Sequence, residues 1–252
     1  MKKLVLRTLA LALLAGLSLQ IYFAGRIALM RWVAPESTSF QRSEIWRLAI
    51  EKHRIDWSQQ WIDGEQISDT LQRAVIASED AGFTEHGGVD WDAMEKAWER
   101  NQREQAKAQQ RASAVKTSSK STAKPAIKSA KVVGGSTISQ QLAKNLFLSG
   151  ERQLLRKGQE FVLTMMLETF LDKDRILEIY LNNVEWGEGI FGAQAAARHY
   201  FHENANQLNA NQGARLAVML PAPKRFEKNP ASPYVLGRAA TIQARMAGVD
   251  LP

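Results

Sequence analysis

The sequence predicts a mainly α-helical domain that follows one N-terminal transmembrane helix. The first 33 residues contain a long apolar stretch without charges, and apolar residues recur at helical spacing through most of the remaining chain. No good run of alternating polar and apolar residues indicates a strand. With 252 residues and 45% apolar content, the chain can bury the core of one ordinary domain beside its membrane segment.

The membrane segment is predicted from an uncharged run, Thr8 to Gly25, that follows three basic residues. Eighteen helical residues span roughly 27 Å against a hydrocarbon core of about 30 Å, and Arg26 can snorkel toward Trp32. A cleaved signal peptide is the alternative, but no convincing small-x-small cleavage site follows the run. We therefore expect a cytoplasmic tail at residues 1–7, an anchor at 8–33, a membrane-proximal segment at 34–66 and the domain at 67–252. The tail carries a slight excess of basic residues, which favours a tail inside the membrane and a domain on its outer side.

Residues that cap helix N-termini, together with apolar residues at helical spacing, predict the helices of the domain. The first begins at Ser68 or Asp69 and ends near Glu79, and a second, capped by Asp90, covers Trp91 to Trp98. We expect further helices after Ser136 or Thr137, at 154–171, 172–183, 191–201 and 210–220, and after a cap at Ser232.

The net charge of +7 comes from one segment, Arg103 to Lys131, which holds eight basic residues and one acidic residue. The rest of the chain is balanced. This segment is rich in Lys, Ser, Ala and Thr and contains too little apolar surface to order itself, so we expect a mobile basic loop. Near an anionic leaflet such a loop can bind phospholipid headgroups, although an idle linker fits the composition equally well. It lacks the interleaved aromatic residues of a nucleic-acid-binding segment, so no nucleic-acid partner is expected. The chain has no cysteine, which excludes disulfides and thiolate metal sites.

The strongest functional signal is the stretch from Ser78 to Trp91, which combines carboxylates, a histidine and glycines. Glu79 and Asp80 fall at the C-terminal end of the first helix, where the helix dipole disfavours a carboxylate. Farther along, a glycine turn opens a helix with Gln140, Gln141 and Lys144, and Arg152 and Arg156 lead into Glu160. A base, hydrogen-bonding amides and several cations are what the transfer of a sugar from a diphosphate requires.

Three other pattern matches carry little weight. Gly187 to Gly192 fits GxGxxG but follows a predicted helix and lacks a ribose-binding aspartate downstream. Two SxxK matches lie in the basic loop without the KTG or SDN partners of an acyl transferase. His199 and His202 have no evident third ligand, so a metal site is not expected.

The motifs, taken in order, resemble those of the peptidoglycan glycosyltransferase family, also called glycosyltransferase family 51. The resemblance is carried by these segments: Glu79-Asp80 with Phe83, His86 and Gly88; Gly134 to Gln141 with Lys144 and Asn145; Arg156-Lys157 with Glu160; and Arg175 to Glu178 with Tyr180 to Asn182. It covers about residues 67–246 and is closest to the monofunctional, membrane-anchored members, which lack a transpeptidase domain. The segment 103–131 departs from the pattern as an insertion.

The resemblance implies a lysozyme-like helical domain that polymerises lipid II into β-1,4-linked glycan strands and releases undecaprenyl diphosphate. Glu79 would be the catalytic base, and Glu160 the second catalytic carboxylate. Seven further residues would bind substrate or diphosphate: Ser136, Thr137, Gln140, Gln141, Lys144, Arg152 and Arg156. Asp80, Phe83, His86 and Gly88 would shape the site.

The same resemblance implies a single-pass protein of the inner membrane with its catalytic domain in the periplasm, serving cell wall synthesis and cell shape. Its partners would be lipid II, the growing lipid-linked chain and membrane lipids, with division or elongation proteins as further candidates. No cofactor is expected to be required, although Mg²⁺ or Mn²⁺ assists some family members. A lytic enzyme that cleaves glycan strands is the rival interpretation, because a lysozyme-like fold with two carboxylates serves that reaction too.

Overall fold

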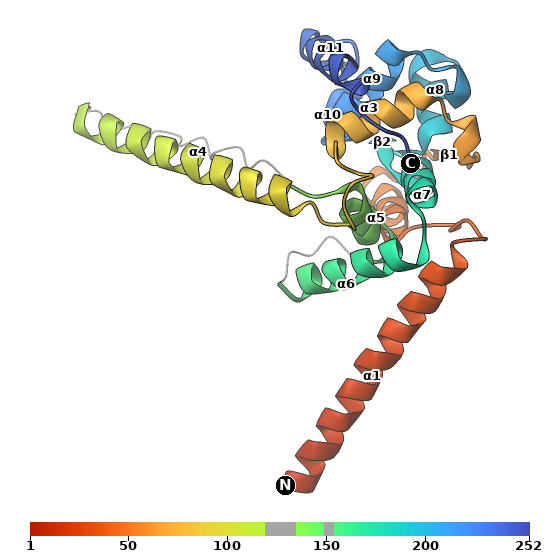
Figure 1. The fold of residues 1–252 in the computed structure, drawn as a ribbon, viewed down its shortest axis with the longest axis vertical. Helices are drawn as coiled ribbons and strands as arrows, with labels where there is room; N and C mark the ends of the chain where they lie inside the picture. The colour runs from red at the N-terminus through yellow and green to blue at the C-terminus, as the bar shows by residue number, and fades with distance from the viewer. Residues whose placement is uncertain (119–134, 149–153) are drawn as a thin grey trace. The chain divides into compact units, whose positions relative to one another are not determined.

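The computed structural model describes residues 1–118, 135–148 and 154–252, and the chain forms two compact units. One unit comprises Met1–Gly88 and Thr137–Pro252, and the other comprises Val89–Ser136. The described part is mainly α-helical, as predicted (Figure 1). Its α-helices are α1 Lys2–Leu29, α2 Ser39–Arg47, α3 Asp69–Glu79, α4 Trp91–Ser118, α5 Ile138–Phe147, α6 Leu154–Phe170, α7 Lys173–Asn183, α8 Ala193–Phe201, α9 Ala210–Met219, α10 Pro223–Phe226 and α11 Pro233–Met246.

Most of the predicted helix starts are confirmed by their capping bonds. The backbone N–H of Leu71 donates to Ser68 Oγ at the start of α3, and that of Val235 donates to Ser232 Oγ at the start of α11. Asp90 accepts from Ala93 N at 2.7 Å at the start of α4. In each case the side-chain oxygen satisfies a backbone donor that has no partner inside the helix.

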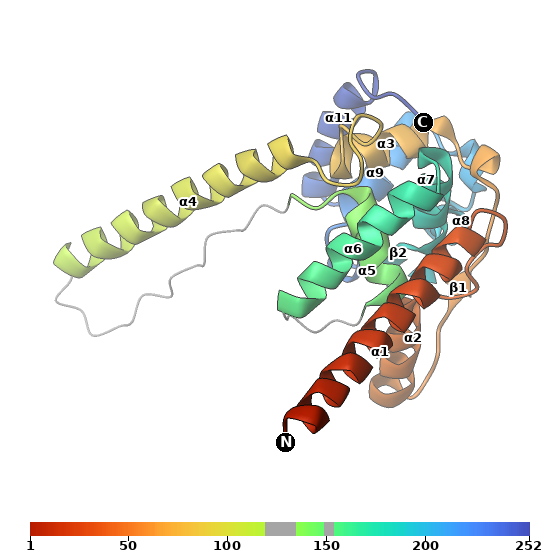
Figure 2. The ribbon, with the colours of Figure 1, turned by 60° about the horizontal axis from the view of Figure 1, so that its bottom comes forward.

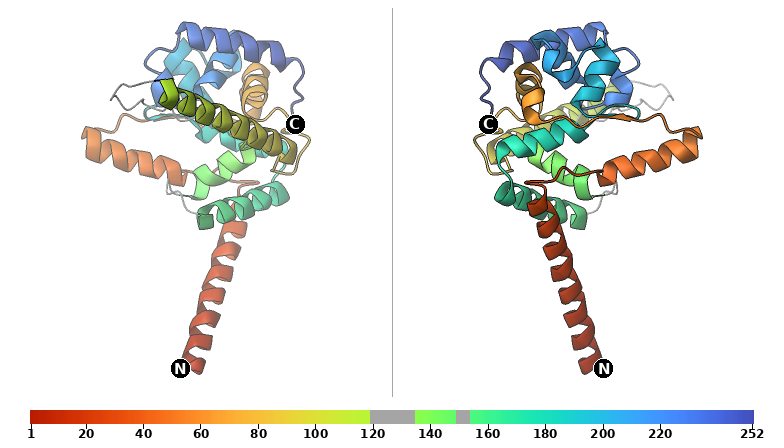
Figure 3. Two further views of the ribbon diagram at one scale, coloured as in Figure 1. Left: turned by 90° about the vertical axis from the view of Figure 1, so that its left-hand side faces the viewer. Right: turned by 90° about the vertical axis from the view of Figure 1, so that its right-hand side faces the viewer.

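Three helices, α3, α9 and α11, pack against one another and hold the end of α3 in place (Figure 3). Leu71, Leu216 and Val235 are buried between them. Gly213 lets α9 approach α3 closely, because a Cβ at this position would lie 3.0 Å from the Cα of Leu71. Glu79 is the last residue of α3, so this packing fixes where its side chain begins.

A three-stranded sheet of very short strands connects the membrane-proximal segment to the domain. Its order is β1 Ser58–Gln59, β3 Ile190–Phe191, β2 Glu185–Gly187, with β1 parallel and β2 antiparallel to β3. Gly189 and Gly192 have φ angles of +73° and +82°, which glycine adopts without strain. A side chain at Gly189 would also collide with the carbonyl oxygen of Asp56. The GxGxxG match is therefore the turn of a small hairpin and the start of α8.

The predicted anchor corresponds to one helix, α1, whose most apolar window has a mean hydropathy of 1.9 and is entirely unburied. By length and composition it can cross a membrane. The C-terminal part of α1 lies beside α6 (Figure 2). There, Gln20 and Gln159 exchange side-chain hydrogen bonds of 2.8 and 3.2 Å, and Ile27 and Met30 are buried in the core.

The bounds of α1 do not coincide with those of the predicted segments. The helix includes the expected tail from Lys2 onward and ends before residues 30–33 of the expected anchor, so the extent of the tail and of the anchor stays a prediction. The membrane-proximal segment contains α2, a π-helical turn (Leu48–Lys52) and β1. Thr38 and Gln41 form a capping box that begins α2, a signal that the sequence contained.

The second helix of the domain is also longer than predicted. It was expected to fade after Trp98, but α4 continues to Ser118, so residues 103–118 of the predicted basic loop are helical. Alternating Glu and Lys or Arg side chains support this extension, since Glu99 pairs with Arg103 and Glu104 with Lys107. Residues 119–131 of the expected loop lie outside the described residues, so its mobility stays a prediction.

Candidate active site

The carboxylate of Glu79 is held by a short chain of hydrogen bonds that runs from α3 to α5 and α7. Gln141 Nε2 donates to Glu79 Oε2 at 3.0 Å, and Tyr180 Oη donates to Gln141 Oε1 at 3.1 Å. Tyr180 is fully buried. Because the tyrosine fixes the orientation of the amide, Gln141 presents its N–H to the carboxylate, and the Glu79 side chain is held in one position.

The surroundings of Glu79 favour its neutral form more than water would. Burial raises the pKa of the Glu79 carboxyl, and the hydrogen bonds from Gln141 and Ser78 oppose this rise. The charge of Asp80 raises the pKa further, whereas the nearby Lys144 lowers it. A carboxylate whose pKa is raised binds a proton more readily, which suits a general base working near neutral pH.

Asp80 ties the end of α3 to the beginning of α5. Its Oδ2 accepts a hydrogen bond of 2.9 Å from the backbone N–H of Ile138, the first residue of α5, and its Oδ1 lies 2.8 Å from His86 Nε2. Since His86 Nδ1 accepts from Gly88 N at 3.1 Å, the histidine proton is on Nε2 and is donated to Asp80. Asp80 thereby keeps Glu79 and Gln141 in register across two helices.

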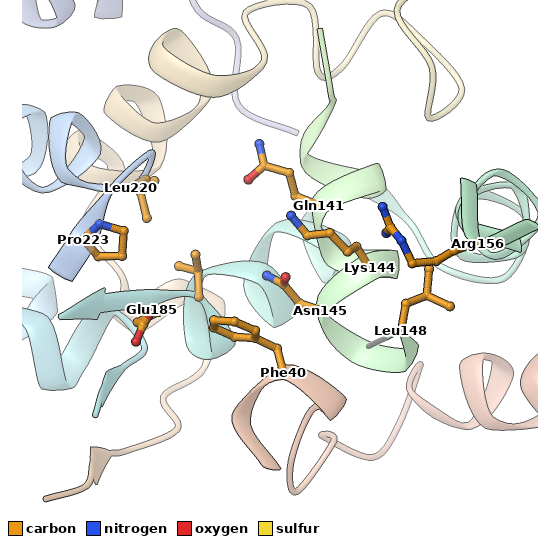
Figure 4. A pocket seen from close by; sticks show the side chains of 10 residues that line it. Phe40, Gln141, Lys144, Asn145, Leu148, Arg156, Glu185, Leu220 and Pro223 are labelled. Atoms are coloured by element: carbon orange, nitrogen blue, oxygen red, sulfur yellow. The ribbon is translucent and has the colours of Figure 1, made fainter. Parts of the chain in front are cut away.

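Two cations line a cavity of about 450 Å³ that also contains Gln141, the residue that holds the Glu79 carboxylate (Figure 4). Lys144 and Gln141 extend from α5 into the cavity, and Arg156 reaches it from α6. Although the Lys144 side chain is exposed, the surrounding protein withholds enough water to lower its pKa, and Glu160 and Glu79 partly oppose this effect. Arg156 Nε is buried without a hydrogen-bond partner among the described residues. Both cations can bind an anion that enters the cavity.

Glu160 lies behind these cations. It is buried, and its carboxylate pairs with Arg156 at 3.2 Å and with Lys157. Its charge raises the pKa of Lys144, which places the carboxylates of Glu79 and Glu160 within electrostatic reach of the same ammonium group.

Other predicted site residues build the frame of the site. Thr137 and Gln140 form the capping box of α5, and Thr137 Oγ1 donates to the carbonyl of Gly88 at 2.6 Å. Neither residue lines the described cavity. Phe83 is fully buried under the ammonium group of Lys173, which lies 4.6 Å from the ring centre. These residues fix α5 and the turn after α3. The site-shaping role of Phe83 and Gly88 stays a prediction.

Two predicted residues are not placed at the cavity. Ser136 is exposed and belongs to the unit Val89–Ser136, and Arg152 lies outside the described residues. Among the residues that the structure describes, no group of three or more His, Asp or Glu side chains could hold a metal ion.

The sequence did not reveal the opposite wall of the cavity. Phe40 from α2, Val184, Glu185 from β2, Leu220 and Pro223 complete the lining (Figure 4). They come from distant parts of the chain and match no motif, so only the fold brings them together. A buried acid such as Glu185, at the start of β2, cannot be distinguished from a solvated one by its sequence context.

A helical fold that places a half-buried, amide-held carboxylate next to a cavity with two cations defines a class of enzyme that can transfer groups from phosphorylated substrates. The family model for transglycosylases matches residues 49–120 and 111–247. The chain is 46% identical over 243 residues to a biosynthetic peptidoglycan transglycosylase of Paraburkholderia phytofirmans, covering 96% of this chain and 91% of the relative.

Proteins with the same name from two further bacteria are equally similar. The chain is 48% identical over 235 residues to that of Bordetella avium, covering 92% of this chain and 90% of the relative. It is 45% identical over 250 residues to that of Bordetella pertussis, covering 98% and 95%. The chain therefore belongs to the transglycosylase family.

Proposed function

We propose that this protein is a peptidoglycan glycosyltransferase that polymerises lipid II into β-1,4-linked glycan strands, with release of undecaprenyl diphosphate, for cell wall synthesis. The names of the relatives support this reaction. The observation that carries the chemistry is the Glu79 carboxylate, held by Gln141 beside a cavity that also contains Lys144 and Arg156.

In this mechanism Glu79 acts as the general base. It accepts the proton of the 4-hydroxyl on the N-acetylglucosamine of the incoming lipid II. The hydroxyl oxygen then attacks the anomeric carbon of the lipid-linked chain from the side opposite the diphosphate, so the configuration inverts. The new glycosidic bond forms as the bond between carbon and the diphosphate oxygen breaks. General base catalysis of this kind contributes roughly 100- to 10,000-fold to the rate.

Negative charge develops on the departing diphosphate, and the cations of the cavity stabilise it. Lys144 and Arg156 both line the cavity, so their charged groups can interact with phosphate oxygens there. Arg152 is proposed to add a third cation. Glu160 positions Arg156 through their ion pair, and its charge opposes the lowering of the Lys144 pKa by desolvation. With these cations present, we propose that no resident metal is required, whether or not Mg²⁺ or Mn²⁺ assists.

The location follows from the substrates, both of which carry a long lipid. We propose that α1 spans the inner membrane once and holds the domain on the periplasmic side, with membrane lipids as neighbours and no nucleic-acid partner. The lytic alternative is disfavoured, because cleavage of a glycan strand by water releases no diphosphate and has no use for the two cations. Division or elongation proteins remain proposed partners.

The experiment is polymerisation of fluorescent lipid II by the purified full-length protein in detergent, analysed by gel electrophoresis. Long glycan strands that muramidase digests are the expected product. Cleavage of preformed strands, together with unchanged lipid II, would instead establish the lytic reaction.

A further inference from the structure

The chain of hydrogen bonds at Glu79 ends at a buried tyrosine that the proposed mechanism does not use. Tyr180 belongs to α7, and its Oη donates to Gln141 Oε1 at 3.1 Å. Gln141 extends from α5 into the cavity and donates to Glu79 Oε2 at 3.0 Å (Figure 4). Tyr180 is not one of the described residues that line the cavity. Any effect of its hydroxyl on the chemistry therefore passes through Gln141.

The side-chain amide of Gln141 has two ends of opposite hydrogen-bonding character. Its oxygen can only accept and its nitrogen can only donate, and the ionised carboxylate of Glu79 can only accept. The nitrogen must therefore face Glu79, which turns the oxygen toward Tyr180. The tyrosine hydroxyl satisfies this oxygen. Without that hydroxyl the oxygen would face a buried ring with no donor, which is unfavourable, and the amide would no longer be held in this orientation.

The hydroxyl of Tyr180 is a donor that does not titrate in the range where the base works. Burial holds the pKa of Tyr180 well above its usual range, and the charges of Glu79 and Asp80 raise this pKa further. Tyr180 therefore keeps its proton while Glu79 changes its charge. The support that it gives to the amide is the same at every pH of interest.

The hydrogen bond from Gln141 matters more to the charge state of Glu79 than any other group that favours the ionised form. Burial has the largest effect and raises the pKa of Glu79, and the bond from Gln141 has the largest opposing effect. Ser78 also lowers this pKa through a bond of 3.4 Å. Of the charged neighbours, Asp80 at the end of α3 raises it and Lys144 on α5 lowers it. Losing the orientation of the amide would thus favour the protonated carboxyl.

We propose that Tyr180 is a positioning residue of the active site, which acts through Gln141 to hold the Glu79 carboxylate ready to accept a proton. This inference rests on the proposed function, since it supports the residue that is the base of that reaction. It extends the site from α3 and α5 to the buried face of α7.

The experiment uses Tyr180→Phe, which removes the hydroxyl and keeps the buried ring. The full-length protein, labelled with ¹³C-glutamate, is titrated in detergent by NMR, and Glu79→Gln identifies the signal of Glu79. We expect Tyr180→Phe to move the midpoint of Glu79 to higher pH. Below that midpoint the rate of lipid II polymerisation should fall roughly 3- to 10-fold, as the loss of one hydrogen bond would give. At higher pH, where Glu79 is ionised in both proteins, the rates should converge.

Two further variants separate this role from a general effect on the core. Tyr200→Phe is the matched control, because Tyr200 Oη donates to the carbonyl of Trp186 at 2.8 Å and takes no part in the chain of bonds at Glu79. It should leave the midpoint unchanged. Gln141→Leu should move the midpoint to higher pH, and adding Tyr180→Phe to it should have no further effect, because the tyrosine acts only through the amide.

An unchanged midpoint in Tyr180→Phe, an equal shift in Tyr200→Phe or a further shift in the double variant would overturn the inference. A rate that falls equally at every pH would do the same, since that is what a merely structural role gives. If Tyr180→Phe does not fold, 3-fluorotyrosine in place of Tyr180 decides. Its hydroxyl is a stronger donor, so the midpoint should move to lower pH, and an unmoved midpoint would overturn the inference. The titration needs no lipid II, so its result is separate from that of the polymerisation assay.

Discussion

At the scale of single residues, the proposed site depends on a carboxylate whose pKa is raised by burial and which accepts a hydrogen bond from Gln141, a residue that lines the cavity. Glu79 has this character because it ends a helix whose other side faces the core, so its backbone is fixed while its side chain is half-buried. Gln141 and Lys144 then stabilise the ionised form that burial disfavours. The pKa of Glu79 is thus a balance of desolvation against three specific neighbours, Gln141, Ser78 and Lys144.

Glu79→Gln should lower the polymerisation rate by roughly 100- to 10,000-fold, because glutamine has nearly the same shape but cannot accept the proton. In the wild type the rate should rise with pH through the raised pKa of Glu79, since only the ionised form is a base. The measurement is the initial rate of lipid II consumption between pH 4.5 and 8.5, with thermal unfolding as a test of folding. Near-normal activity of a folded Glu79→Gln variant would contradict the assignment of the base.

At the scale of elements, the junction of α3 and α5 decides whether the site is assembled. Asp80, His86 and Gly88 connect the two helices through backbone hydrogen bonds. Gly88 has a φ of +88°, and a Cβ there would lie 2.8 Å from side-chain carbons of Glu168 and Thr164 on α6. Only glycine fits this point, where the turn after α3 passes over α6.

Gly88→Ala should therefore destabilise the protein by about 1–3 kcal/mol, because the backbone conformation and the contact with α6 are both strained. Its activity should fall as well, since the displaced turn carries the acceptor of the Thr137 hydrogen bond. Gly87→Ala is the control: a Cβ at Gly87 meets nothing within 4 Å, and φ is not positive there. Thermal unfolding in detergent measures both variants. Equal melting temperatures for the two variants would show that the turn is not constrained as described.

The elements also show what could be predicted from the sequence. The helix starts at Ser68, Asp90 and Ser232 were predicted correctly, because a cap is a local interaction between neighbouring residues. The predicted end of α4 was too early. The composition of this segment indicated a loop, and the ion pair between Glu99 and Arg103, which supports a helix, was overlooked. Glu79, Gln141 and Lys144 were predicted as site residues from motifs. Phe40 and Glu185 were not predicted, because they come to line one cavity only after the fold brings α2 and β2 together.

At the scale of the whole molecule, α1 combines two roles along its length. Its N-terminal part has no buried residue and is apolar enough to face lipid, whereas Ile27 and Met30 belong to the core of the domain. Phe23 also contacts Phe147 edge to face, with ring centres 5.2 Å apart. The end of the anchor is thus packed on α5 and α6, the helices that carry Lys144 and Arg156.

A variant without residues 1–19 should keep its fold but lose much of its activity on membranes. None of the removed side chains is buried, so its melting temperature should stay near that of the full chain. Anchoring confines enzyme and substrate to one surface, which can raise their effective concentration by 100-fold or more, on the order of the gain from tethering. We therefore expect the rate with lipid II in liposomes to fall at least about tenfold, in line with that gain, and the rate in detergent to change little.

The matched control lacks residues 1–33 and so loses Ile27 and Met30 as well. Removing two buried side chains from the core should lower its stability by several kcal/mol, on the order of 2–5 kcal/mol for each large apolar residue. The shorter deletion separates attachment to the membrane from the integrity of the domain, and the longer one affects both. If the variant without residues 1–19 polymerised liposomal lipid II as fast as the full chain, the anchor would not act by confining the enzyme to the bilayer. Co-sedimentation with the liposomes would then show whether the domain alone is sufficient to hold the protein on the surface.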